Sequence, residues 1–177
     1  MKTEFSRDPQ TNRSLRHSLK DAVAFATMTG IGETYFSAFA LFLKATTPQI
    51  GMLASLPPLL ASFVQLLSAW LGRLTGKRKW LILTGAGLQA FAWIPLLLLP
   101  LLVPERAVPL LIACVVLYQG GAHLVTPQWS SLMGDIVPAK RRGRFFALRT
   151  RLVTAFPFLS LLVGGFILHF FNGRGST

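Results

Sequence analysis

The sequence predicts an all-α integral membrane protein with five membrane-spanning helices. Of its 177 residues, 52% are hydrophobic and only 14% are charged, whereas soluble domains usually carry about 25% charged residues. The 18 Lys and Arg residues against six acids give a net charge of +12. These cations lie between long apolar runs, which identifies the lipid bilayer as a partner and argues against nucleic acid, for which cations along the helices are expected.

Five apolar segments are long enough to cross a hydrocarbon core of about 30 Å, which needs about 20 helical residues. A polar cytoplasmic tail over 1–21 precedes them. No cleavable signal peptide is expected, because the first segment exceeds a signal's apolar region of about 7–15 residues. Prolines inside the segments favour a membrane, where neighbouring helices make them tolerable. The predicted spans are 22–43, 50–71, 80–103, 107–133 and 145–171, followed by a tail over 172–177.

The cations alternate from one side of the predicted membrane to the other. Five lie in the N-terminal tail, four in the loop after the second span, and six in the loop after the fourth span and the start of the fifth. The three remaining cations lie on the other side. The positive-inside rule therefore predicts a cytoplasmic N-terminus and, with five spans, an external C-terminus. We expect the inner membrane of a prokaryote-like cell.

Glu33 is the only acid that lies deep inside a predicted span. An ionisable group near the middle of a bilayer is costly and is a candidate functional site. At helical spacing Glu33 shares a face with small residues such as Ala26, Gly30 and Ala40, which indicates another helix or a cavity beside it. We expect Glu33 to bind a proton or a cationic substrate.

Polar side chains also follow the second and fourth spans. In the second, a stripe of small and polar residues predicts close helix packing. In the fourth, Gln119 and His123 share a face, and His123 has about the depth of Glu33, so this pair could exchange a proton in a water-lined cavity. Plain helix packing and a structural hydrogen bond of His123 remain the alternatives. The second-span stripe consists of Gly51, Ser55, Pro58, Ser62, Gln65 and Ala69, and Gln65 joins the predicted cavity lining.

Sequence motifs of enzymes and cofactor sites are missing. The chain has no phosphate-binding glycine loop, no H-E-x-x-H, no G-x-S-x-G and no Cys/His ligand cluster. We therefore expect no catalytic activity, no cofactor and no metal site.

Two cytoplasmic loops carry a family resemblance. Residues 71–79 resemble the signature G-x-x-x-D-R-x-G-R-R between the second and third helices of the major facilitator superfamily. Gly76, Lys77 and Arg78 match its second half, while Ala69 and Arg73 replace its first glycine and its aspartate. Residues 135–144 are similar to the D-x-x-P-x-x-x-R-G-R segment between helices four and five of that superfamily.

This resemblance implies the N-terminal half of a secondary transporter for a small-molecule substrate, built as a partial six-helix half-bundle of inverted repeats. Five spans then predict a truncated or split transporter whose partner is the missing C-terminal helices or a second half. A non-transporting five-helix assembly or regulatory subunit is the alternative. The resemblance also implies a cytoplasmic gate formed by Gly76, Lys77, Arg78, Asp135, Arg142 and Gly143.

Overall fold

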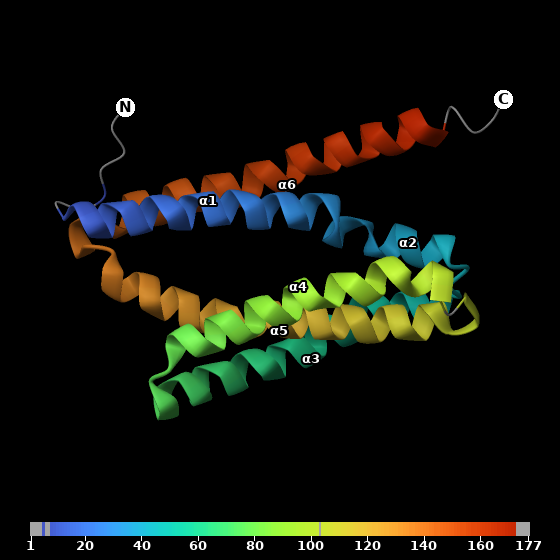
Figure 1. The fold of residues 1–177 in the computed structure, drawn as a ribbon, viewed down its shortest axis with the longest axis horizontal. Coiled ribbons are helices and arrows are strands. Elements are labelled where there is room, and N and C mark those ends of the chain that lie inside the picture. Colours follow the sequence, from blue (N-terminus) through green and yellow to red (C-terminus); the bar gives the residue numbers. More distant parts are fainter. Residues whose placement is uncertain (1–4, 6–7, 103, 173–177) are drawn as a thin grey trace. The chain divides into compact units, whose positions relative to one another are not determined.

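The computed structural model describes residues 5, 8–102 and 104–172. In this part of the chain, helices follow one another with short turns between them (Figure 1). The chain divides into two compact units. One consists of residues 1–36 and 134–177, and the other of residues 37–133.

The first unit is built around two parallel helices, α1 (Pro9–Ile31) and α6 (Arg142–Asn172), which lie side by side in Figure 1. At one end the rings of Phe5 and Phe145 meet edge to face, with their centroids 5.4 Å apart. Toward the other end Gly30 lies against Pro157 and Ser160. The face of α1 that is buried carries Leu15, Ala22, Ala26 and Gly30, at the spacing of one helical stripe.

Short turns complete this unit. The 3-10 turn η1 (Glu33–Tyr35) follows α1, and η3 (Ala139–Arg141) precedes α6. Asp8 caps α1, because its carboxylate accepts hydrogen bonds from the amides of Gln10 at 3.3 Å and Thr11 at 2.9 Å. The predicted cytoplasmic tail is therefore helical from Pro9 onward, whereas most of the predicted external tail lies outside the described residues.

The second unit contains α3 (Thr47–Thr75), α4 (Arg78–Leu102) and most of α5 (Ala107–Ile136). The short helix α2 (Phe36–Phe42) precedes them, and the turn η2 (Pro104–Arg106) separates α4 from α5. A capping box between Thr46 and Gln49 begins α3, and Gly76 ends it in the left-handed conformation with a φ of 63°.

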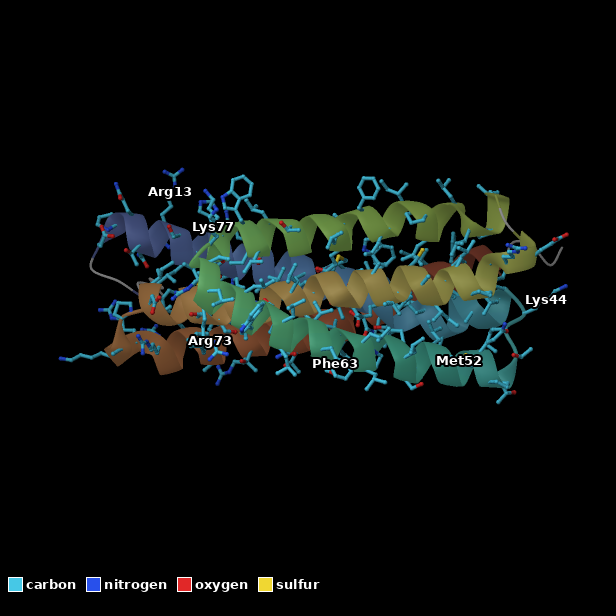
Figure 2. The ribbon with its side chains drawn as sticks, turned by 90° about the horizontal axis from the view of Figure 1, so that it is seen from below. Arg13, Lys44, Met52, Phe63, Arg73 and Lys77 are labelled. Atoms are coloured by element: carbon cyan, nitrogen blue, oxygen red, sulfur yellow. The ribbon has the colours of Figure 1, made fainter. Side chains whose placement is uncertain are left out.

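Contacts between named residues set the directions of these three helices. Along α3, Gln65 and then Gly72 meet His123 and then Gln128 of α5, so α3 and α5 are parallel. Along α4, Gly85 lies beside Gly121 whereas Trp93 contacts Tyr118, so α4 runs antiparallel to α5. In Figure 2, Arg73 and Lys77 mark one end of α3, and Lys44 precedes its other end.

Among the described residues, four helical segments are long and apolar enough to cross a membrane: Thr47–Thr75, Arg78–Leu101, Ala107–Ile136 and Ala139–Phe170. Their outer surfaces are apolar, as lipid requires; Leu66 is 71% exposed, Leu97 72% and Phe166 71%. The predicted class of helical membrane protein is therefore confirmed, but the count of five spans is not.

The first predicted span, 22–43, differs because it is not one helix. The helix α1 ends at Ile31, and the turn η1 separates it from α2. Gly30 and Gly32 flank this end, and each glycine costs a helix about 1 kcal/mol relative to alanine. The hydroxyl of Thr34 then donates to the carbonyl oxygen of Thr29 at 3.0 Å, which favours the turn over a continuous helix.

The packing face predicted for the second span is also wrong. Gly51, Ser55, Pro58, Ser62 and Gln65 are exposed, and Ala69 is half-buried. The buried residues of α3 are Leu53, Pro57, Ala61 and Ser68. The prediction failed because the face of α3 that packs within the unit is largely apolar and carries one small polar residue, Ser68. The predicted stripe leaves its polar side chains accessible.

Candidate transport site

Glu33 lies at the point where the first helix is broken. The amide of Gly32 still donates to the carbonyl oxygen of Met28 at 2.8 Å, four residues back, as in an α-helix. The amide of Tyr35 donates to the carbonyl oxygen of Gly32 at 3.0 Å, three residues back. The half-buried Glu33 is the first residue of the tighter turn. Its carboxyl group is thus carried by irregular backbone inside an apolar stretch.

The residues on both sides of Glu33 contact α6. Before it, a Cβ added to Gly30 would lie 2.7 Å from Cα of Pro157 and 2.7 Å from Cβ of Ser160, so the backbones of the two helices touch. After it, the hydroxyl of Tyr35 donates to the carbonyl oxygen of Leu161 at 3.0 Å. The broken segment is therefore fixed to the first unit on both sides of the acid.

In the second unit, the structure brings together two of the predicted polar residues. Nδ1 of His123 lies 2.9 Å from Oε1 of Gln65. Because an amide oxygen can only accept, Nδ1 of His123 is the donor of this pair. Gln119 is half-buried one turn before His123 on the same helix.

Glu33 belongs to the first unit, and Gln65, Gln119 and His123 belong to the second. The Gln65–His123 contact shows that His123 already has a hydrogen-bond partner, as one alternative reading of the sequence required. Proton exchange between Glu33 and His123 stays a prediction.

Sequence reasoning missed the most buried polar contact between α3 and α5. The hydroxyl of Ser68 donates to the carbonyl oxygen of Leu124 at 2.6 Å. The amide of Gln128 donates to the carbonyl oxygen of Ser68 at 2.5 Å and lies 3.1 Å from its hydroxyl. Ser68 is fully buried and Gln128 is 3% exposed. The available signal was Gln128 itself, because a glutamine in an apolar span has to find a partner in the protein.

The first predicted gate segment forms the turn between α3 and α4. Gly76 ends α3, the amide of Lys77 donates to the hydroxyl of Thr75 at 3.3 Å, and Arg78 begins α4. The positive φ of Gly76 explains why glycine occupies this position, since most other residues would be strained there. These contacts shape the turn between α3 and α4. The gating role of Gly76, Lys77 and Arg78 stays a prediction.

The second gate segment connects α5 to α6. Nε of Arg142 donates to the carbonyl oxygen of Val137 at 3.1 Å, and its Nη2 contacts the carbonyl oxygen of Gly134. Arg142 therefore satisfies carbonyl groups at the C-terminal end of α5, where a cation is also favoured by the helix dipole. Asp135 is exposed in the last turn of α5, and a Cβ added to Gly143 would find nothing within 4 Å.

Comparison with protein families identifies a match over most of the chain. A family model described as Major Facilitator Superfamily matches residues 22–176, which include every helix from the second half of α1 onward. Searches of curated proteins and of solved structures returned no significant match.

Proposed function

The chain belongs to the major facilitator superfamily, a family of transporters, and we propose that it moves a small solute across the inner membrane by alternating access. In this proposal Glu33 binds a proton or a cationic group of the solute. Gln65, Gln119 and His123 line the polar path through the membrane.

The position of Glu33 at the helix break is the observation that carries this proposal. Transporters commonly build their sites from discontinuous helices, whose irregular backbone is tolerated where it lines a cavity. The C-terminal end of α1 at Ile31 precedes the carboxyl group, and Glu33 itself begins the next helical turn, so the two helix dipoles oppose each other there. The carboxylate is what favours a proton or a cation over an anion.

The broken segment from α1 through η1 to α2 is the fifth membrane crossing in this proposal. The predicted span 22–43 has the required length of about 20 residues when its two helical parts and the turn are taken together. The low apolar content of α1 as a whole reflects the part of this helix that precedes Ala22, which we assign to the cytoplasm.

The parallel arrangement of α1 and α6 supports a cytoplasmic N-terminus. Exposed cations gather at the N-terminal ends of both helices, so one end of the first unit is strongly basic and matches the positive-inside rule. They include Arg13 and Arg16 in the first half of α1, Lys140 in η3 and Arg144 in the first turn of α6. The loops with Gly76, Lys77 and Arg78, and with Asp135, Arg142 and Gly143, then serve as the cytoplasmic gate.

A second helical half is the partner that this mechanism requires. In transporters of this type the substrate site lies at the interface of two repeats or halves that rock against each other. We therefore propose that the helices of this chain act together with such a half, supplied by another segment or another chain.

The experiment measures solute-driven proton flux in proteoliposomes with an entrapped pH-sensitive dye. The chain is co-reconstituted with a second half, and sugars, amino acids and organic cations are tested separately. We expect at least one class to drive proton movement, and Glu33→Gln to abolish it. Glu105→Gln, the same change at an exposed residue of the turn η2, should retain it. Flux that persists in Glu33→Gln would show that Glu33 has no role in coupling.

A further inference from the structure

The turn that carries Glu33 is anchored to α6 at two points one helical turn apart. Before the acid, Gly30 packs against Pro157, where only a glycine leaves room for the other backbone. After the acid, Tyr35 reaches Leu161 with a hydrogen bond of 3.0 Å. Glu33 lies between these two anchors, so its backbone cannot move relative to α6 unless one of them is released.

The second anchor is the place on α6 that receives the ring and the hydroxyl of Tyr35. A Cβ on Gly164 would lie 3.2 Å from the ring of Tyr35, and one on Gly165 would lie 3.4 Å from its hydroxyl. Two adjacent glycines therefore leave the space that the half-buried ring occupies. In the membrane core lipid offers the phenol no alternative hydrogen-bond partner, so the carbonyl oxygen of Leu161 determines where the ring docks.

We propose that Tyr35 is the positioning residue of Glu33. Its hydroxyl anchors the far side of the helix break to α6 and thereby fixes the environment of the carboxyl group. The connection is short, because the amide of Tyr35 also closes the 3-10 turn on the carbonyl oxygen of Gly32. This inference rests on the proposed role of Glu33. Tyr35 holds that acid in place, and α6 is the rigid support to which Tyr35 binds.

The test follows the chemical accessibility of Glu33 and needs no substrate. The 177-residue chain in proteoliposomes is treated with a water-soluble carbodiimide and an amine, and the rate at which each acid is modified is measured by peptide mass spectrometry. We expect Tyr35→Phe to raise the rate at Glu33 about two- to tenfold, the range that corresponds to loss of one ordinary hydrogen bond. The rates at Asp8 and Asp21, which do not depend on the anchor, should stay unchanged.

The chain offers a matched control for this substitution. It contains two tyrosines, and Tyr118→Phe removes the same hydroxyl from the second unit. We expect the Tyr118→Phe variant to modify Glu33 at the wild-type rate. An equal increase in both variants, or an increase at every acid in Tyr35→Phe, would mean general loosening of the fold and would overturn the proposal.

A second variant keeps the hydroxyl and displaces the ring. Gly164→Ala presses a methyl group against Tyr35 and should raise the rate at Glu33 in the same direction. Gly87→Ala, where nothing lies within 4 Å of the added Cβ, should not. Wild-type rates in both Tyr35→Phe and Gly164→Ala would refute the anchor. Failure of the transport role of Glu33 is seen separately, as proton flux that survives Glu33→Gln.

Discussion

Two neighbouring glycines of α5 should respond in opposite ways to the same substitution. A Cβ on Gly121 would lie 2.7 Å from the carbonyl oxygen of Gly85 and 3.0 Å from the amide nitrogen of Gln89, both backbone atoms of α4. A Cβ on Gly120 would meet only Cγ2 of Val64, at 3.9 Å. The first position marks the closest approach of two helices, whereas the second has room for a methyl group.

The expected free-energy changes follow from these distances. At Gly121 the new methyl group would be well inside ordinary contact distance of an oxygen that belongs to a helix backbone, so α4 and α5 must separate. Overpacking of this kind costs about 1–3 kcal/mol. At Gly120 the methyl group strains nothing, and the gain in helix propensity is up to about 1 kcal/mol. Gly121→Ala should therefore destabilise the protein, while Gly120→Ala should leave its stability unchanged or raise it.

The single cysteine provides the assay. Cys114 is half-buried on the same helix, so a dye that becomes fluorescent on thiol reaction reports its exposure during thermal unfolding in mild detergent. At this chain length a change of 1 kcal/mol corresponds to roughly 2–4 °C in Tm. We expect a lower Tm for Gly121→Ala only. Equal shifts in both variants, or a larger loss for Gly120→Ala, would refute the reasoning about helix contact.

Two further predictions concern the buried serine contact and the first helix cap. Ser68→Ala removes the hydroxyl hydrogen bond between α3 and α5 and should lower the free energy of unfolding in an SDS titration by about 0.6–1.7 kcal/mol. Ser62→Ala is the control and should lower it less, because the Ser62 hydroxyl donates to a carbonyl oxygen of its own helix. The side-chain hydroxyl and the amide of Thr11 donate to the carboxylate of Asp8 and lower its pKa below 3.8. Because the pKa is lower in the folded state, the ionised carboxylate stabilises the cap at pH values above the ordinary pKa of an aspartate. This stabilisation is lost as the pH falls through the folded-state pKa, so amide exchange at Thr11 should accelerate only in acid. Exchange that is independent of pH, after correction for its intrinsic rate, would contradict this cap.

The sequence predicted the parts of the fold that depend on composition averaged over a whole helix. Long apolar runs separated by basic loops indicated a helical membrane protein, and four helical segments of the described residues are long and apolar enough to cross a membrane. The break at Gly32 was missed because hydropathy does not register backbone conformation. Two glycines beside Glu33 were visible in the sequence, but glycines also occur inside helices, and the contacts of this segment with α6 are tertiary.

The candidate site was predictable only where a single residue was exceptional. Glu33 stood out as an acid in an apolar span, and its position at the helix break strengthens that choice. The partners of the polar residues were not predictable, because helical spacing describes one helix and a hydrogen bond across helices depends on their rotation. The face predicted to pack on α3 is exposed, and Ser68 lies on the buried face beside Gln128.

The polar contacts divide into two kinds that suit different tasks. Ser68 and Gln128 are buried and mutually satisfied, an arrangement that holds α3 and α5 together and has no capacity to take up a proton. Gln65 is exposed and His123 half-buried, and Nε2 of His123 takes no part in their contact. Glu33 is likewise only half-buried. Groups that must exchange protons or ligands need such access, so accessibility separates the candidate transport residues from the structural ones more sharply than polarity alone.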